Sequence, residues 1–359
     1  MKRKHAIFAV PAAASALLLP DQLAAKAADA VRELLAEAAA ANTTRSYATA
    51  LRYWAGWYQA RYGAEMTLPV GEATVIQFLV DHIVRKSKTG YVTELPTEVD
   101  AALVAAGLKA SLGTLKLSTV TQRVAVLSTA HKLKRLDNPC ELPTVRTLLS
   151  RARRSSVKRG ERASKKTAIT RVELEAMLAT CDDSLEGVRD RALLCFGFAS
   201  GGRRRSEIAA ADMRDLRKSG DQNYVYRLEH SKTQQSGVTA GSTPDKPIIG
   251  RSAVALAEWL GAAKISEGPI FRRIWKNRVG PALLPGSVAK IVKRRAALAG
   301  LNGDFGAHSL RSGFVTEAGK QGVPLPAVMA MTEHRSVASV VGYFQAGQAE
   351  DNPAARLLK

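Results

Sequence analysis

The sequence predicts a two-domain protein that is mainly α-helical, with a small antiparallel sheet in its C-terminal domain. Its 359 residues exceed the size of a typical single domain, roughly 100–200 residues. Hydrophobic residues make up 46% of the chain and charged residues 24%, which are ordinary values for a folded protein. Helical periodicity recurs along most of the chain, whereas strand-like alternation is clear only over residues 224–230.

The charge of the chain predicts its partner class. There are 53 Lys and Arg residues against 32 Asp and Glu, a net charge of +21. Such an excess favours polyanions, because neutralising phosphates releases their counterions. Nucleic acid is the first candidate and an anionic membrane the second.

The cysteines and the N-terminus bear on the compartment. Cys140, Cys181 and Cys195 are odd in number and widely spaced, which fits a reducing cytoplasm and no zinc site. Residues 1–20 superficially resemble a signal peptide, but Pro11 interrupts the apolar stretch and no disulfide framework follows. We therefore expect a cytoplasmic, DNA-associated protein with no membrane partner. A membrane-associated protein that uses these first residues is a weaker alternative.

Residues 1–41 form an N-terminal segment whose Ala/Leu-rich part, 21–41, predicts an amphipathic helix. The first domain, residues 42–145, is expected to be all-helical because no strand-like alternation interrupts it. Polar residues 42–44 are candidate N-caps for its first helix. Further helices are predicted over residues 74–84, 97–106 and 118–136.

One apolar stripe marks that first helix. Tyr47, Leu51, Trp54 and Tyr58 recur at spacings of four, three and four residues, and Arg45 lies off the stripe. A core stripe with a solvated basic face is the simpler interpretation for each residue. In a chain of this charge, Arg45 is also a candidate DNA contact.

Residues 146–167 are expected to form a basic interdomain linker that begins at the end of a helix. Nine basic residues face a single acid, Glu161, in this stretch. A merely solvated segment is the alternative, but a linker lying along a phosphate backbone fits the charge better. Lys165 and Lys166 are candidate DNA contacts.

The second domain, residues 168–359, begins with a capping box formed by Thr170 and Glu173. A buried helix is predicted over 189–199. The alternating stretch 224–230 predicts a strand that pairs with residues 247–249, and helices return after it.

Two segments of this domain carry basic residues suited to phosphate chemistry. Arg204 and Glu207 follow a glycine pair and share one helical face, where the carboxylate can hold the guanidinium in place. Lys232 follows the predicted strand. Each feature by itself is more often surface charge than a catalytic group.

Two further segments supply imidazoles, an arginine and a phenol. His308 and Arg311 lie three apart on one helical face. His334 and Tyr343 are nine residues apart, which would place them on opposite sides of a continuous helix. The helix must therefore break if both face one site, and Ser336 is a candidate N-cap for the new helix.

The order Arg, Lys, His-x-x-Arg, His, Tyr resembles the tyrosine recombinases, also called phage-integrase-type recombinases. The motifs cover residues 189–345, and the helical region 42–136 is similar to the family's core-binding domain. Glu333 stands where the family usually has Gly, which affects the local turn and the pKa of His334. Gly201 stands where many members have Thr, a departure that we expect to be minor.

The resemblance implies the DNA breaking-rejoining fold and a site-specific recombinase that needs no metal, ATP or other cofactor. Tyr343 would attack the phosphate to form a 3′-phosphotyrosyl intermediate. The other roles would fall to the basic residues and Glu207: Arg204, Arg311 and His334 as phosphate ligands, Lys232 as general acid, His308 as base, and Glu207 as the support of Arg204. It also implies double-stranded DNA as partner, a homotetramer, and strand exchange through a Holliday junction.

Two alternatives belong to other classes. A catalytically inactive DNA-binding protein would keep the fold, but the presence of every catalytic residue type argues against it. A type IB topoisomerase would share the chemistry, but the helical first domain and the His334–Tyr343 interval favour a recombinase.

Overall fold

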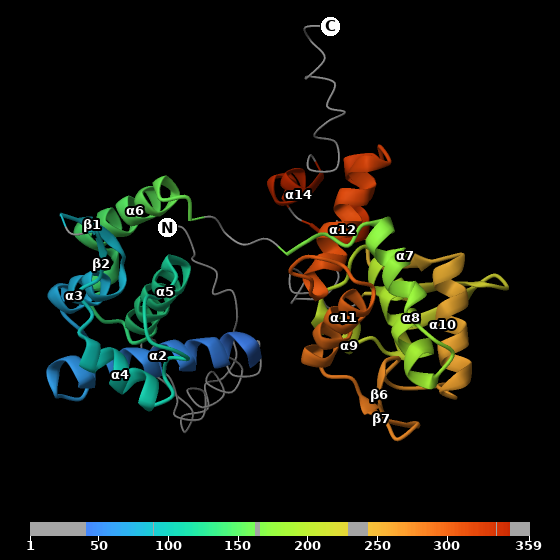
Figure 1. The fold of residues 1–359 in the computed structure, drawn as a ribbon, viewed down its shortest axis with the longest axis horizontal. Coiled ribbons are helices and arrows are strands. Elements are labelled where there is room, and N and C mark those ends of the chain that lie inside the picture. The colour runs from blue at the N-terminus through green and yellow to red at the C-terminus, as the bar shows by residue number, and fades with distance from the viewer. Residues whose placement is uncertain (1–40, 89, 162–165, 229–242, 335, 345–359) are drawn as a thin grey trace, which may run out of the picture. The chain divides into compact units, whose positions relative to one another are not determined.

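The computed structural model describes residues 41–88, 90–161, 166–228, 243–334 and 336–344 (Figure 1). The chain divides into two compact units, Met1–Ala163 and Ser164–Lys359. Residues 21–40 of the helix predicted over 21–41, together with Lys165 and Lys232, lie outside the described residues. Within the described ranges, no helix is both long and apolar enough to cross a membrane.

The first unit is a helical domain with one small hairpin. Its helices are α2 (Ala41–Tyr62), α3 (Glu72–His82), α4 (Thr97–Ala105), α5 (Leu117–Leu133) and α6 (Pro143–Lys158). Strands β1 (Arg85–Ser87) and β2 (Gly90–Val92) pair antiparallel between α3 and α4 (Figure 1). The expectation of an exclusively helical domain is therefore corrected. These strands have three residues each and bury no apolar face, so the sequence shows no alternation that would reveal them.

The buried stripe of helix α2 shares Trp54 with the predicted stripe but otherwise consists of other residues. Ala50, Tyr53, Trp54 and Trp57 are buried, whereas Tyr47 is 37% exposed. Both stripes have helical spacing, and tertiary partners select between them: Trp54 stacks on Phe78 at 3.7 Å between ring centroids. The indole of Trp57 and the hydroxyl of Tyr53 also find buried hydrogen-bond partners on α3. Residues 42–44 lie inside α2 and do not cap it, since the helix begins before them.

Helix α6 occupies much of the stretch expected to be a linker. It continues to Lys158, and Arg159 follows as its C-cap. The charged side chains of residues 146–158 are thus presented by a helix of the first unit. A helix fixes the spacing of these charges, which an extended linker would not do.

The second unit contains the α-helices that follow α6, together with two small sheets among the described residues. Its helices are α7 (Arg171–Ala179), α8 (Leu185–Ala199), α9 (Arg205–Ala209), α10 (Arg251–Ala262), α11 (Pro285–Leu298), α12 (Ala307–Lys320), α13 (Leu325–Thr332) and α14 (Val337–Phe344). Its strands are β3 (Leu216–Ser219), β4 (Asn223–Arg227), β5 (Asp245–Ile248), β6 (Arg272–Trp275) and β7 (Arg278–Ala282). The capping box of Thr170 and Glu173 is present at the start of α7, as predicted.

The larger sheet confirms the predicted strand pairing. Strands β3, β4 and β5 are antiparallel in that order, with Tyr224 opposite Ile248 and Val225 opposite Pro247. Strand β3 and the β6–β7 hairpin were not predicted from the sequence.

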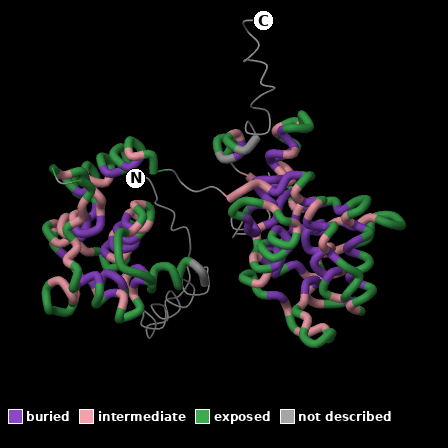
Figure 2. Tube along the Cα trace, viewed as in Figure 1, coloured by how far each residue is buried: buried purple, intermediate pink, exposed green. Residues whose placement is uncertain are grey.

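The core of the second unit surrounds α8, which is buried along most of its length (Figure 2). Because α8 is held on all sides, the turn that follows it has a fixed position. That turn carries the first arginine motif.

Candidate functional site

Two glycines place the turn after α8 against two other helices. A Cβ on Gly202 would lie 2.3 Å from Cα of Arg311, and one on Gly201 would lie 2.2 Å from the carbonyl oxygen of Met331. Both glycines have positive φ, which other residues rarely adopt. Only glycine lets this turn approach α12 and the end of α13 so closely. The departure at Gly201 is therefore not minor in this chain.

Arg204 caps the short helix α9 and is held by Glu207. One Glu207 oxygen accepts a hydrogen bond from Nη1 of Arg204 at 2.6 Å, and the other accepts from the Arg204 amide at 3.0 Å. Burial alone would raise the pKa of Glu207, but the charges of Arg203 and Arg204 outweigh it and lower that pKa. Glu207 is thus a buried carboxylate that fixes the direction of the Arg204 side chain.

The first turn of α12 carries His308 and Arg311. His308 is exposed, whereas Arg311 is only 3% exposed and reaches toward the end of α13. Its guanidinium donates to the carbonyl of Thr332, to that of Gly202 at 3.4 Å, and to Nε2 of His334 at 3.3 Å. One side chain therefore connects three of the motifs that the sequence singled out.

The contacts of His334 define its tautomer. The Thr332 hydroxyl donates to the Val328 carbonyl at 2.8 Å, so its oxygen is left to accept from Nδ1–H of His334 at 2.7 Å. Nε2 then accepts from Arg311. The imidazole is accordingly assigned as neutral, with its proton on Nδ1.

Burial and neighbouring cations lower the pKa of three residues of the basic cluster, His308, Arg311 and His334. Burial, then Arg311 and Arg204, lower the pKa of His334 to about 4, and the same causes lower the pKa of His308. Burial, then Arg204 and Arg203, lower the pKa of Arg311 to about 9. Both imidazoles are therefore neutral at pH 7, and an incoming phosphate would relieve the repulsion among the cations.

Tyr343 lies on a helix separate from His334, as the spacing argument requires. Helix α13 ends at Thr332, Glu333 adopts the left-handed conformation with φ of 59°, and α14 begins at Val337. Val340 of α14 is fully buried against Val315 of α12 and Val328 of α13. This contact anchors the helix that carries Tyr343, whose side chain is outside the described part of the structure, as is all of Lys232.

The predicted DNA contacts lie in different surroundings. Arg45 is exposed on α2 and lines a hollow together with residues of α5. Lys166 is half-buried and forms an ion pair with Asp304. Lys165 is not among the described residues.

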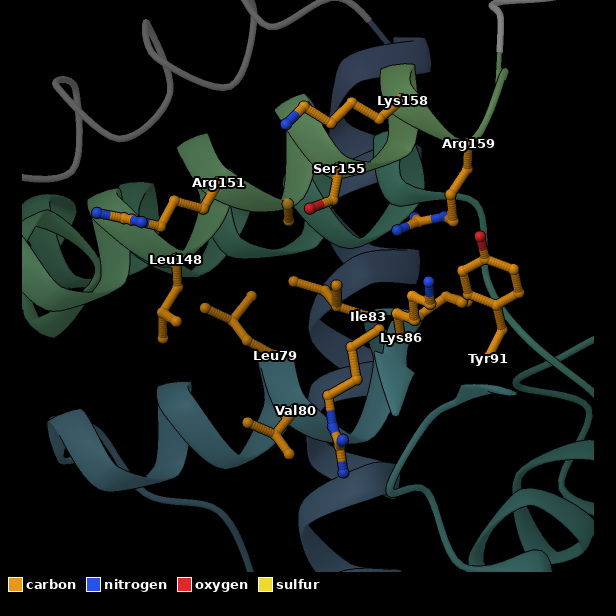
Figure 3. A pocket seen from close by; sticks show the side chains of 13 residues that line it. Leu79, Val80, Ile83, Lys86, Tyr91, Leu148, Arg151, Ser155, Lys158 and Arg159 are labelled. Carbon is orange, nitrogen blue, oxygen red and sulfur yellow. The ribbon is translucent and has the colours of Figure 1, made fainter. Parts of the chain in front are cut away.

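A basic cleft in the first unit was missed from the sequence. The cleft measures about 490 Å³, and its apolar floor includes Leu79, Ile83 and Leu148 (Figure 3). Five cations line it and no acidic residue does: Arg85, Lys86, Arg151, Lys158 and Arg159. Three of them belong to the predicted linker. The excess charge of that stretch was therefore a usable signal, although the sequence did not predict that a helix presents these residues.

Three charged residues near the site were also missed. Arg203 is 1% exposed, Lys246 is fully buried, and Glu333 is 8% exposed. The run of three arginines at 203–205 gives no indication of which member is buried. Lys246 lies outside every motif, whereas Glu333 was noticed only as a departure from the family.

Comparisons with known proteins identify the family of this chain. Residues 167–350 match the phage integrase family. An integrase/recombinase XerD homologue of Selenomonas ruminantium is 30% identical over 338 residues, which cover 90% of this chain and 87% of that protein. The recombinase Cre of Escherichia phage P1 is 23% identical over 266 residues, or 68% of this chain and 75% of that protein.

Among solved structures, a lambda integrase dimer bound to a COC′ core site is similar at 15% identity and a TM-score of 0.46, covering 89% of this chain and 94% of that one. The family match spans just over half of the chain, and the XerD homologue aligns along nearly all of it. The chain belongs to the phage integrase family and is a tyrosine recombinase.

Proposed function

We propose that this protein is a site-specific recombinase that cleaves and rejoins double-stranded DNA through a covalent bond to Tyr343. The observation that carries the proposal is the convergence of Arg204, Arg311 and His334 around one surface. Arg311 contacts His334, and the charge of Arg204 lowers the pKa of both residues. Two mutually repelling arginines beside a neutral imidazole are prepared for an anion such as a phosphodiester.

The two arginines would stabilise the transition state. Attack on a phosphodiester creates a pentacoordinate phosphorus with additional negative charge on its non-bridging oxygens. Arg204 and Arg311 each offer several N–H donors to those oxygens, and Glu207 keeps Arg204 directed. His334, neutral in the free protein, would gain a proton beside the phosphate and become a further donor.

Proton transfer would be divided between two residues. A phenol in water has a pKa near 10, so Tyr343 would need a base to become a nucleophile. His308 is exposed and its pKa is lowered, so it is neutral and able to accept that proton. Lys232 would protonate the leaving 5′-oxygen. The 3′-phosphotyrosyl bond conserves the phosphodiester energy, so a 5′-hydroxyl can rejoin the strand without ATP.

DNA binding is assigned to the basic surfaces of both units. The cleft lined by Arg151, Lys158 and Arg159, together with exposed Arg45, gives the first unit cations for the phosphate backbone. A homotetramer that exchanges strands through a Holliday junction is the assembly that the family resemblance implies. A cytoplasmic, DNA-associated location belongs to the same proposal and is compatible with three unpaired cysteines.

A nicked suicide substrate tests the function. Duplexes selected for binding to the wild-type protein are nicked near the binding site, so that cleavage traps the covalent intermediate. We expect a denaturation-resistant protein–DNA adduct with the wild type and none with Tyr343→Phe. Binding without an adduct on any selected duplex would instead favour a catalytically inactive DNA-binding protein. An adduct with Tyr343→Phe would assign the attack to another nucleophile.

A further inference from the structure

The end of α13 is held by charged side chains from three other parts of the second unit. The Ala330 carbonyl accepts from Nζ of Lys246 at 2.7 Å, and the Met331 carbonyl accepts from Nη2 of Arg203 at 2.6 Å. The Thr332 carbonyl accepts from Arg311. A helix ends with carbonyls that lack partners within the helix, and here three cations satisfy them in succession.

Lys246 occupies a fully buried position in which every donor is used. Its ammonium group has three N–H donors, and three acceptors surround it: the carbonyls of Thr243 and Ala330, and Oε1 of Glu333 at 2.8 Å. The lysine is 0% exposed and the carboxylate side chain only 4%. Burial lowers the pKa of Lys246, while the hydrogen bond and the charge of Glu333 oppose this shift.

Glu333 holds the left-handed turn from which His334 emerges. Its φ of 59° and ψ of 37° are costly for a residue with a side chain, and its amide closes the helix on the Met329 carbonyl at 2.8 Å. A glycine would adopt this conformation without that cost. The presence of Glu is explained by its carboxylate, the counter-charge of a lysine that is buried close to Arg203 and Arg311.

We propose that Lys246 and Glu333 are positioning residues for His334 and Arg311. Their ion pair joins strand β5 to the turn after α13. It thereby fixes the backbone from Thr332 to His334. The carbonyl of Thr332 orients Arg311, and its hydroxyl orients His334. The inference rests on the proposed recombinase function and adds to it two residues that contact no DNA.

Four variants of the full-length protein separate the charge pair from the backbone. Glu333→Gly removes the carboxylate and also the steric cost of the left-handed conformation, so a loss of activity reports the missing charge. Glu333→Gln keeps the shape of the side chain, and Lys246→Met removes the opposite charge. The double variant Lys246→Met with Glu333→Gly removes the pair, while the Thr243 hydroxyl still donates to the Ala330 carbonyl at 2.6 Å.

The measurements are the single-turnover rate of adduct formation on the nicked duplex and the Kd for the same duplex. We expect each single variant to form adduct about tenfold more slowly or worse, because small displacements of catalytic groups are costly. The Kd should change less than about twofold, since neither side chain reaches the surface. The double variant should be about as slow as a single variant and not slower by the product of the two losses, because the two side chains act as one pair.

Lys109→Met is the matched control. Lys109 and Lys246 are the two buried lysines among the described residues, and Lys109 pairs with Asp100 in the first unit. Its loss should lower the melting temperature without slowing adduct formation below that temperature. If Lys246 had a purely structural role, Lys246→Met would likewise lower the melting temperature without slowing adduct formation.

The outcomes distinguish the inference from the function on which it rests. If the wild type forms an adduct and both Glu333 variants form it at the wild-type rate, the positioning role alone is overturned. A double variant whose loss equals the product of the Lys246→Met and Glu333→Gly losses would overturn the charge pairing. No adduct with the wild type would overturn both the function and the inference.

Discussion

Neighbouring residues of identical type have different tasks in this protein. Arg203 and Arg204 are adjacent, yet the first is buried and donates to the Met331 carbonyl, while the second is partly exposed and held by Glu207. Both guanidiniums act on the same site, one through the backbone of α13 and one toward the open surface. The backbone at Arg204 is extended, with φ of −70° and ψ of 152°, and successive side chains of an extended backbone point to opposite sides.

Glu207→Gln tests the support of Arg204. We expect adduct formation to fall by roughly 10- to 100-fold, because a less firmly held guanidinium stabilises the phosphate less well. Unfolding should become easier by about 1–3 kcal/mol, since two arginines lose a buried counter-charge. Glu186→Gln is the control: Glu186 pairs with Arg189 and Arg294, and its side chain is 47% exposed. Unchanged cleavage by Glu207→Gln across a range of pH would refute the supporting role.

His334 makes the stability of the second unit dependent on pH. Its pKa is about 4 in the folded protein because of burial and then Arg311 and Arg204, and near 6.5 in an unfolded chain. The folded state thus favours the neutral imidazole. The contribution of His334 to the free energy of unfolding is therefore complete above pH 6.5 and is lost as the pH falls toward 4.

Denaturant titrations at pH 7.5 and pH 5 measure this contribution. Between pH 7.5 and pH 5, the free energy of unfolding of the wild type should fall by on the order of 1 kcal/mol more than that of His334→Asn. His82→Asn provides a comparison in the first unit, where burial lowers the pKa of His82 to about 4. Equal losses for wild type and His334→Asn would contradict the assigned pKa.

At the scale of elements, the break between α13 and α14 is the feature that matters for catalysis. Glu333 ends α13 in the left-handed conformation, and α14 then runs as its own short helix. A small apolar cluster that includes Val315, Val328 and Val340 connects α12, α13 and α14, apart from the main core of the unit. Helix α14 packs mainly against α12, and Val340 is its buried residue in this cluster.

Val340→Ala should loosen the helix that carries Tyr343. The lost side-chain volume should cost about 2 kcal/mol locally, so adduct formation falls while DNA affinity stays the same. Val337→Ala is the matched control, because Val337 lies on the same helix and is 50% exposed. If the two variants cleave equally well, the packing of Val340 does not hold Tyr343 in place.

At the scale of the whole molecule, the net charge of +21 governs DNA binding. The affinity for nonspecific duplex should fall roughly 10³-fold between 50 and 200 mM salt, as phosphate contacts release counterions. Arg45→Ala should reduce the slope of log K against log salt by about one if this exposed arginine contacts a phosphate. Binding titrations at several salt concentrations measure both. A flat salt response would mean that the charge is not used on DNA.

The sequence by itself determined the family resemblance and several local elements. Residue types at fixed short spacings identified Arg204 with Glu207, His308 with Arg311, and the required break before Tyr343. The capping box at Thr170 and the β4–β5 pairing also follow from local rules. Such features depend on residues near one another in the chain, for which helical and strand geometry is known beforehand.

Only the tertiary structure decided which side chains are buried and which distant partners they meet. Lys246 and Glu333 are 87 residues apart, and Arg203 lies 128 residues from the Met331 carbonyl. The choice between two apolar stripes on α2 likewise depended on Phe78 of another helix. The physical reason is that burial and long-range charge pairing depend on how elements pack together, and no short-range spacing in one sequence encodes that packing.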